Sequence, residues 1–427
     1  GRWARQAPAA RKRVLARFAE GIVAARDELA LLETLDMGKP IAYSRSVDVP
    51  ATARCIQWYA EAIDKVYDEI APTADTALAL ITREAMGVIG CIVPWNYPMI
   101  MAAWKLGPAL ATGNSVVLKP SEKSPLTALR LAEIALEAGL PAGVFNVVPG
   151  FGHEAGEALA LHMDVDAIGF TGSTRVGRRM LDYSARSNLK RVYNELGGKS
   201  ANIVFADFDN LERAAATAVG SMFFNQGESC NAPSRLFVQR SIADEFVARM
   251  VAAAPKFMPA DPLDESTVMG ALVDGTQLST VMGYIDAGMG EGAQCLVGGK
   301  QARASTGGFY VEPTLFDGVS NHMKIAREEI FGPVLSVIRF DTEDEAIAMA
   351  NDTSYGLQAA VWSSHLDRAH RVARKLRAGT VHVNQYDDDD MTVPFGGFKQ
   401  SGNGRDKSLH ALEKYTELKT TWIRLAM

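Results

Sequence analysis

Short apolar runs alternate with amphipathic segments along most of this chain, and this alternation constrains the fold more than any other feature. The alternation occurs in two series, which are separated by Gly197-Gly198. Short apolar runs predict buried strands, and the segments with helical periodicity predict crossover helices on both faces of a parallel sheet. We therefore expect an α/β protein with two Rossmann-like parallel sheets and a small β extension.

The first series is expected to contain helices at 9–34, 49–66, 125–138, 154–162 and 174–184, and strands at 86–94, 115–119, 144–148, 167–170 and 191–194. A further helix should follow the turn at 95–98 and end near 113–114. The second series is expected to contain strands at 202–205, 235–238, 294–297, 334–340, 358–363 and 380–383, and helices at 211–224, 242–253, 277–287, 343–351 and 366–376. The tail, 415–425, reads as a strand that needs a partner.

The overall composition excludes several classes of protein. The 427 residues are 48% hydrophobic and 22% charged, with a formal net charge of −6. An acidic chain argues against a general nucleic-acid or membrane-surface binder, and no apolar run reaches the ~18 residues of a membrane span. The four cysteines form no CxxC pair, so we expect neither a disulfide framework nor a zinc or other metal site. Free thiols fit a reducing compartment, and we expect the cytoplasm.

The sequence begins at Gly1 rather than at methionine, and Arg2-Trp3-Ala4 reads as internal sequence. We therefore expect that a natural N-terminal segment precedes it.

Cys230 and Glu195 suggest covalent catalysis. Cys230 lies in a polar, glycine-containing turn, and Glu195 leads into Gly197-Gly198. A thiol and a carboxylate that converge in the fold would serve as nucleophile and general base. The alternative is an inert, buried thiol of the kind that most lone cysteines are.

Other polar motifs lie near predicted strands, and each has two interpretations. Asn96, in a turn after a strand, is either an oxyanion donor or a turn former. The segment 171–177 opens a helix, so it either binds phosphate or only caps that helix. Lys119 and Glu122 follow another strand and either bind a ribose or form a solvated loop. Glu329, with an aromatic neighbour, suits a second ribose or a charged helix end.

Taken together, these segments resemble the aldehyde dehydrogenase superfamily. The motifs PWNYP, KPSEKSP, FTGSTRVG, NELGGKS, NQGESC, EEIFGP and PFGGFKQSG occur in this order over essentially the whole chain. The stretches LETLDMGKPI, WKLGPALATGNSVVLKPSEKSPLTALRLA and FKQSGNGRDKSLHALEKYTELK are most similar to the branch that oxidises γ-glutamyl-γ-aminobutyraldehyde, 4-guanidinobutyraldehyde and related aminoaldehydes of polyamine catabolism.

The resemblance implies NAD-dependent oxidation of an aldehyde to a carboxylic acid through a thiohemiacetal and a thioester on Cys230. A catalytically silent homologue and a CoA-acylating enzyme remain as alternatives. The implied catalytic residues are Cys230 as nucleophile, Glu195 as base, Asn96 as oxyanion donor, and Lys105 and Asp406 as a proton relay. The implied cofactor residues are Trp95, Lys119, Ser121, Glu122, Phe170, Gly172, Ser173, Gly177, Leu196, Glu329 and Phe331. The implied substrate residues are Tyr97, Trp104, Asn231, Asp388 and Asp389.

Charge predicts two preferences. A Glu122 carboxylate at the adenosine ribose would repel a 2′-phosphate and favour NAD over NADP. The acidic run Asp387–Asp390 borders the substrate funnel by resemblance, so it would attract a cationic aldehyde tail, although a solvated surface is the alternative. The resemblance also implies an NAD-binding domain (1–66 and 86–197, with 400–413 returning to it), a catalytic domain (198–399), oligomerisation strands (67–85 and 414–427), and a homodimer or homotetramer.

Overall fold

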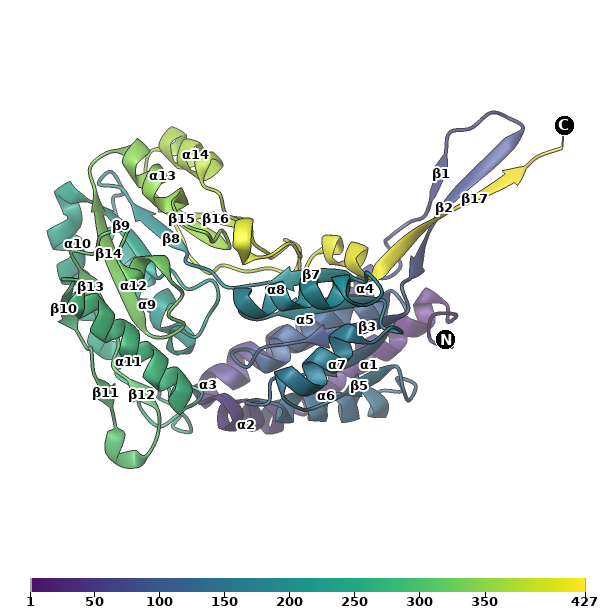
Figure 1. The fold of residues 1–427 in the computed structure, drawn as a ribbon, viewed down its shortest axis with the longest axis horizontal. Coiled ribbons are helices and arrows are strands. Elements are labelled where there is room, and N and C mark those ends of the chain that lie inside the picture. The colour runs from purple at the N-terminus through teal and green to yellow at the C-terminus, as the bar shows by residue number, and fades with distance from the viewer. Residues whose placement is uncertain (1, 427) are drawn as a thin grey trace.

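The computed structural model describes residues 2–426, which contain two large parallel sheets, a projecting antiparallel arm and a two-stranded ribbon (Figure 1). The expected α/β class, with two parallel sheets and a small β extension, is confirmed. Gly1 and Met427, the outermost residues of the predicted NAD-binding and oligomerisation parts, lie outside the described residues. The roles that the sequence assigns to these parts stay a prediction.

The first sheet has five parallel strands in the order β5-β4-β3-β6-β7. Its strands are β3 (Val88–Ile92), β4 (Ser115–Lys119), β5 (Phe145–Val147), β6 (Ala167–Thr171) and β7 (Arg191–Glu195). The helices of this half are α1 (Pro8–Ala24), α2 (Arg26–Met37), α3 (Ile41–Tyr43), α4 (Val49–Ala62), α5 (Pro98–Ala111), α6 (Leu126–Glu137), α7 (Glu157–Leu161) and α8 (Thr174–Ala185), with π-helical turns at Ser44–Asp48 and Gly152–Gly156.

The second sheet has seven strands in the order β10-β13-β14-β9-β8-β15-β16, and only β10 runs antiparallel. Its strands are β8 (Ala201–Val204), β9 (Arg235–Gln239), β10 (Gln294–Val297), β13 (Thr314–Asp317), β14 (Val334–Phe340), β15 (Gln358–Trp362) and β16 (Thr380–Val383); β11 (Gln301–Ala302) and β12 (Tyr310–Val311) form the ribbon. Its helices are α9 (Leu211–Phe223), α10 (Arg240–Ala253), α11 (Gly275–Gly290), α12 (Lys324–Arg327), α13 (Glu343–Asn351) and α14 (Leu366–Lys375), and 3₁₀ turns lie at Phe224–Gly227, Ala254–Phe257, Ala304–Thr306, Lys399–Ser401 and Leu409–Tyr415.

The expected tail strand is confirmed as β17 (Thr416–Arg424), and its partner is β2 (Ala77–Ala85). These two strands pair antiparallel from Thr416–Ala85 to Arg424–Ala77, and the short β1 (Glu69–Ala71) adds to the other edge of β2. In Figure 1 this arm projects away from both sheets. Because the sheet order is β1-β2-β17, one edge of β17 has no strand beside it among the described residues.

One predicted helix differs from the structure, and some strands were not predicted. The helix expected at 9–34 is two helices, since α1 ends at Ala24 and α2 begins at Arg26. No proline or glycine lies at this break, so the helical periodicity of the sequence continues across it. Val23, near the end of α1, is 56% exposed, whereas Ile22 is fully buried. Strand β13 was not predicted, because its four residues follow an irregular segment without clear periodicity.

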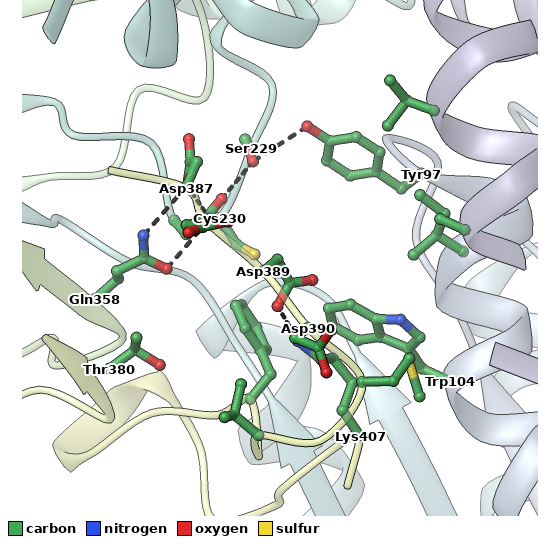
Figure 2. Close-up of a pocket in the computed structure, with 18 of the residues that line it drawn as sticks. Tyr97, Trp104, Ser229, Cys230, Gln358, Thr380, Asp387, Asp389, Asp390 and Lys407 are labelled. Atoms are coloured by element: carbon green, nitrogen blue, oxygen red, sulfur yellow. Dashed lines mark hydrogen bonds and ion pairs between the residues drawn. The ribbon is translucent and has the colours of Figure 1, made fainter. Parts of the chain in front are cut away.

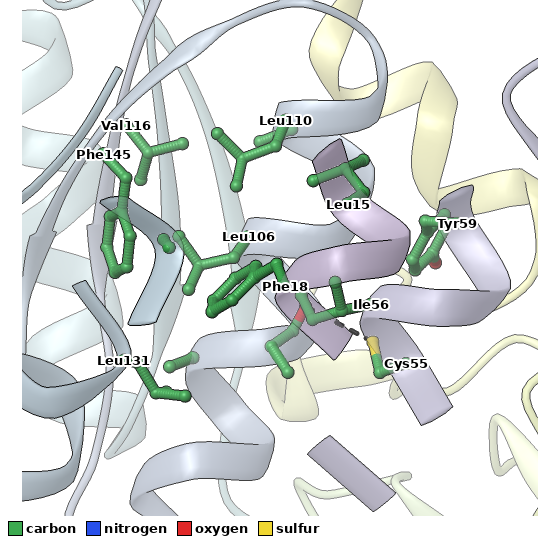
Figure 3. Packing of buried hydrophobic residues seen from close by; sticks show 14 of the residues in the cluster. Leu15, Phe18, Cys55, Ile56, Tyr59, Leu106, Leu110, Val116, Leu131 and Phe145 are labelled. Carbon is green, nitrogen blue, oxygen red and sulfur yellow. Dashed lines mark hydrogen bonds between the residues drawn. The ribbon is translucent and has the colours of Figure 1, made fainter. Parts of the chain in front are cut away.

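The largest apolar core lies between the five-stranded sheet and the helices α1, α4, α5 and α6 (Figure 3). Phe18 of α1, Ile56 of α4 and Leu106 of α5 are buried in it. Helix α5 follows the Trp95–Pro98 turn, and every one of its residues is buried. This packing gives the turn and the strand ends beside it a rigid support. Within residues 2–426, no helix combines the length and apolarity that crossing a membrane requires.

Candidate active site

Cys230 follows a tight turn that ends helix α9. Asn225, Gln226 and Gly227 have φ values of 50°, 57° and 70°, a left-handed conformation that is costly for the first two residues. A Cβ on Gly227 would lie 2.3 Å from the carbonyl oxygen of Gly332, so the close approach requires glycine there. The Asn225 amide donates to the carbonyl oxygens of Asn96 and Glu228 and stabilises the turn. The strain thus serves to present Cys230.

The thiol of Cys230 lines a cavity of about 660 Å³ (Figure 2). Trp104 and Phe395 form part of its apolar wall, with ring centroids 5.0 Å apart. A polar chain borders the nucleophile: Tyr97 donates to Ser229 at 3.4 Å, and Ser229 donates to Asn231 at 2.6 Å. The cavity therefore combines an apolar channel with polar groups next to the sulfur, as ligand sites commonly do.

Electrostatics keep this thiol protonated at rest. Burial raises the pKa of Cys230, and the nearby carboxylates of Glu329 and Glu195 raise it further. The thiolate is the nucleophilic form, so the reaction needs a group that accepts the proton. Other buried thiols have raised pKa values too, and Cys55 donates to the carbonyl oxygen of Ala103 inside the core. Cys230 differs from Cys55 because it faces a cavity.

Glu195 ends strand β7 and is only 3% exposed. Neither of its carboxylate oxygens has a hydrogen-bond partner among residues 2–426. Burial raises the pKa of Glu195 well above the usual range, and the charge of Asp406 adds to this effect. A buried carboxylate without partners is costly, and such groups concentrate at functional sites. These properties suit a general base.

Two lysines hold Asp406 in the protein interior. Lys105 of α5 and Lys414 both form ion pairs with its carboxylate, and all three side chains are buried. Burial alone would raise the pKa of Asp406, but the two ammonium groups outweigh it and the pKa is lowered. Lys105 and Asp406 were both predicted as proton-relay residues, a role that stays a prediction, whereas Lys414 was not singled out. A lysine before a tail strand gives no sequence signal of such a contact.

Asn96 lies behind the catalytic turn. Its side-chain amide is 3% exposed and donates to the carbonyl oxygen of Glu228 at 2.9 Å. An amide nitrogen carries two hydrogens, so this bond fixes the group while one hydrogen remains to donate. Asn96 is therefore held close to the turn that carries Cys230, although the structure does not place it on the cavity wall.

Most of the predicted cofactor residues gather at the carboxyl edge of the five-stranded sheet. Lys119 ends β4, Phe170 lies near the end of β6, and Leu196 follows β7. The Lys119 ammonium pairs with Glu122 at 3.1 Å. Ser173 caps helix α8 by accepting from the N–H of Val176 at 3.4 Å. The carboxyl edge of a parallel sheet, with a helix N-terminus beside it, suits a dinucleotide.

Glycine and serine residues shape this edge. Gly177 faces Leu196 so closely that a Cβ would lie 2.5 Å from the leucine side chain, and Gly172 similarly lies against Phe170. Ser121 is buried and accepts from the N–H of Lys123 at 3.2 Å. Trp95 lies beside Lys123, whose ammonium is 5.4 Å from the ring centroid.

Glu329 and Phe331 come from the second half of the chain and meet the same region. The N–H of Gly198 donates to Glu329 at 3.0 Å, and a Cβ on Gly197 would lie 2.1 Å from the same carboxylate. Burial raises the pKa of Glu329 to about 7. Phe331 adopts φ 58° and packs edge-on against Trp95 at 5.3 Å. A bulky residue with positive φ is strained, which indicates a functional constraint. These residues fit a dinucleotide between the two sheets.

Comparison with known proteins identifies the family. The aldehyde dehydrogenase family model matches residues 1–421. The chain belongs to the aldehyde dehydrogenase family. It is 57% identical over 425 residues to the "NADP/NAD-dependent aldehyde dehydrogenase PuuC" of Escherichia coli K12, covering 100% of this chain and 85% of that protein.

Two solved aldehyde dehydrogenases are similarly close. The γ-glutamyl-γ-aminobutyraldehyde dehydrogenase of Burkholderia cenocepacia has a TM-score of 0.98 and 62% identity, covering 99% of this chain and 86% of that one. An indole-3-acetaldehyde dehydrogenase in complex with NAD⁺ gives the same four values.

The predicted substrate residues of this aldehyde dehydrogenase all line the cavity that contains Cys230. They are Tyr97, Trp104, Asn231, Asp388 and Asp389. The carboxylates of this wall differ in whether a cation of the protein already neutralises them. Asp389 forms an ion pair with Lys407, and the neighbouring Asp390 pairs with Arg54 at 2.6 Å. Within residues 2–426, no cation pairs with Asp388. The sequence prediction chose Asp388 and Asp389 alike and did not foresee the ion pair of Asp389.

Asp387 is the acid of this run that lies nearest the catalytic turn, and it was not chosen as a substrate residue. Its carboxylate accepts from Asn231 at 2.7 Å and from Gln358 at 3.2 Å. The residue is open to the cavity, yet protein atoms crowd the carboxylate, and this burial raises the pKa of Asp387 to about 7. Four adjacent aspartates look alike in sequence, so only the fold distinguishes them.

Proposed function

We propose that this aldehyde dehydrogenase uses NAD to oxidise aldehydes that carry an amino or guanidino group to carboxylic acids. The observation that carries the proposal is the position of Cys230 in a cavity whose wall also presents Asp387 and Asp388. Four carboxylates stand at this wall against the two cations Arg54 and Lys407, so the wall is net negative. A cationic tail would be attracted there while the aldehyde reaches the sulfur.

The names of relatives support this substrate class. A solved relative is named a γ-glutamyl-γ-aminobutyraldehyde dehydrogenase, and an "Aminoacetaldehyde dehydrogenase" of Pseudomonas aeruginosa is 49% identical. The indole-3-acetaldehyde enzyme, by contrast, is named for an uncharged, bulky substrate. Charge at the cavity wall is therefore the property to test.

The residues support a reaction in two stages. The Cys230 thiol loses its proton to solvent in the cavity, and the sulfur attacks the carbonyl carbon to form a thiohemiacetal. Asn96 and the N–H of Cys230 donate to the oxyanion. NAD, when bound, supplies the acceptor for the hydride that this adduct loses. Glu195 then takes a proton from water, and the water attacks the resulting thioester, which releases the acid and the thiol. Lys105 and Asp406 would carry that proton away from Glu195.

The cofactor would lie along the carboxyl edge of the five-stranded sheet. Lys119 and Glu122 would hold the adenosine ribose, and Gly172, Ser173 and the start of α8 would hold the pyrophosphate. Glu329 would hold the nicotinamide ribose, next to Phe331. We also propose a preference for NAD over NADP because of Glu122, although the name of the E. coli relative includes both cofactors.

Assembly and location belong to the same proposal. Strand β17 has an open edge among the described residues, and Leu418 and Trp422 on it are 66% and 67% exposed. Exposed apolar side chains on an unpaired strand edge favour pairing with another copy, which supports a homodimer or homotetramer. The four cysteines are all free, which supports a reducing compartment such as the cytoplasm.

The test follows NADH absorbance with a matched pair of substrates. The protein is mixed with NAD and either 4-guanidinobutyraldehyde or butanal, each with and without CoA. We expect NADH formation without CoA and a higher kcat/KM for the guanidino substrate. Equal kcat/KM for both would refute charge recognition, a strict need for CoA would indicate an acylating enzyme, and no NADH with any aldehyde would indicate a silent homologue.

A further inference from the structure

Gly220 occupies a position in helix α9 where nothing in the backbone requires glycine. It lies inside the helix and is absent from the positions with positive φ. A Cβ added to Gly220 would meet no other atom within 4 Å. Glycine is the least favourable helix-interior residue after proline, so its presence at an unconstrained site needs another reason.

Several other helical glycines of this protein have a packing reason. A Cβ on Gly107 of α5 would lie 2.5 Å from the ring of Tyr59, and one on Gly177 of α8 would lie 2.5 Å from Leu196. Gly21 of α1 meets Ile134 at 2.7 Å in the same way. These glycines allow close packing. At Gly220 the space is empty, so packing does not explain the residue.

The empty space at Gly220 belongs to the cavity that contains Cys230. Gly220, Ser221 and Phe224 all line that cavity. Gly220 and Phe224 are four residues apart, a spacing that places them on one side of the helix end. The Phe224 ring packs against Tyr43 at a centroid distance of 4.9 Å, which fixes this part of the wall. The missing side chain at Gly220 therefore widens the channel beside a fixed aromatic ring.

We propose that Gly220 determines substrate specificity by keeping open the volume that the tail of a long or broad aldehyde occupies. This inference rests on the proposed oxidation of an aldehyde. The proposed function concerns the charge of the substrate, and this inference adds the size and shape of its tail. A side chain at this position would fill that volume while the carbonyl could still reach Cys230. Short aldehydes do not extend to this part of the wall, so they should be far less sensitive.

Selectivity between two uncharged aldehydes provides the test, because it does not depend on the carboxylates. The kcat/KM for 3-phenylpropanal is divided by the kcat/KM for propanal in wild type, Gly220→Ala and Gly220→Leu. We expect the ratio to fall as the side chain becomes larger. In Gly220→Leu it should fall by about tenfold or more, because the leucine fills the space in which the phenyl group would bind. An unchanged ratio in Gly220→Leu would overturn the proposal.

Gly283 of α11 offers a matched control. It is also a helical glycine with nothing within 4 Å of an added Cβ, and it does not line the cavity. Gly220→Ala and Gly283→Ala should both raise the melting temperature, because alanine favours the helix at compatible sites. Only the Gly220 variants should change the substrate ratio, and an equal change in Gly283→Leu would refute the assignment.

A binding measurement separates this inference from the proposed function. Calorimetry with 3-phenylpropanamide reports occupation of the channel without turnover, and its Kd should rise about tenfold in Gly220→Leu. If wild type oxidises neutral aldehydes but shows no preference for cationic ones, the proposed substrate charge fails while the Gly220 inference stands. If the Kd is unchanged in Gly220→Leu, the Gly220 inference fails whatever the substrate.

Discussion

Asn231, the residue after Cys230, donates a hydrogen bond to the carboxylate of Asp387 at 2.7 Å. This bond joins the catalytic turn to the acidic loop, two segments that lie far apart in sequence. The carboxylate of Asp387 on the cavity wall is therefore held in a fixed position relative to the sulfur of Cys230. A preorganised charge discriminates between substrates better than a mobile surface residue does.

Replacing Asp387 with asparagine should weaken recognition of cationic aldehydes. The KM for 4-guanidinobutyraldehyde should rise about tenfold, equivalent to about 1.4 kcal/mol, and the KM for butanal should stay within about twofold. Because burial raises the pKa of Asp387 to about 7, its carboxylate is charged above that pH and neutral below it. The wild-type preference for the guanidino substrate should therefore weaken as pH falls through about 7, whereas the variant should show no such change. Equal effects on both substrates would contradict charge recognition.

Asn96→Ala should slow turnover by about 10²-fold or more, because one donor to the oxyanion is lost. The variant also loses a bond to the carbonyl oxygen of Glu228, which lowers stability by about 1 kcal/mol. Asn188→Ala removes amide bonds to the carbonyl oxygens of Met163 and Val165, outside the cavity lining, and serves as the control. Steady-state kcat and the melting temperature are measured for both. Activity within twofold of wild type in Asn96→Ala, or equal losses in the two variants, would reject the oxyanion role.

Glu195→Gln should trap the acyl-enzyme. Thioester formation does not need the base that activates water, so one equivalent of NADH should appear and then turnover should slow by about 10²-fold to 10⁴-fold. Intact-mass spectrometry after mixing with NAD and propanal should show one acyl group, and peptide mapping should place it on Cys230. Cys230→Ala should show neither the burst nor the adduct. A Glu195→Gln enzyme that turns over normally without an adduct would rule out Glu195 as the base.

Lys414 should set the pH at which the base works. Burial chiefly raises the pKa of Glu195, Asp406 raises it further, and Lys105 and Lys414 lower it. Glu195 accepts protons only in its ionised form, above its pKa. Lys414→Met removes a charge that lowers this pKa, so the acidic limb of the kcat profile should move to higher pH. Lys414→Arg keeps the charge and should restore the profile. Lys190 is another buried lysine, held by the carbonyl oxygens of Ala160 and His162, and Lys190→Met should leave the limb in place. A shift of similar size in both methionine variants would show a loss of stability instead.

Glu122→Gln should relax the choice of cofactor. The change removes a negative charge from the proposed ribose site and releases Lys119 from its ion pair, which favours a 2′-phosphate. The ratio of kcat/KM for NADP to that for NAD should rise about tenfold. Glu133 on helix α6 is an exposed carboxylate with an arginine partner, so Glu133→Gln is the control. No change in the ratio would place the Glu122 carboxylate away from the ribose.

The two sheets were predictable because their strands are apolar runs, and a run such as Val88–Ile92 must be covered on both faces. The break between α1 and α2 was not predictable, since Ala25 carries no helix-stopping signal. The sequence singled out Cys230 and Glu195 as candidates from their polar and glycine-rich surroundings, and the structure places Cys230 at the cavity and buries Glu195. Asp387 and Lys414 were not recognisable, because their roles depend on tertiary partners. The sequence alone does not distinguish an aspartate that is paired with Lys407 from an aspartate that is open to the cavity.

The pairing of β2 with β17 has a consequence for biogenesis. One strand lies at 77–85 and the other at 416–424, so a ribosome must synthesise the whole segment 86–415 before these strands can join. Contacts between such distant segments form late, because a long intervening loop must close first. Any association of copies through the complete β17 strand must therefore wait until translation has passed residue 424.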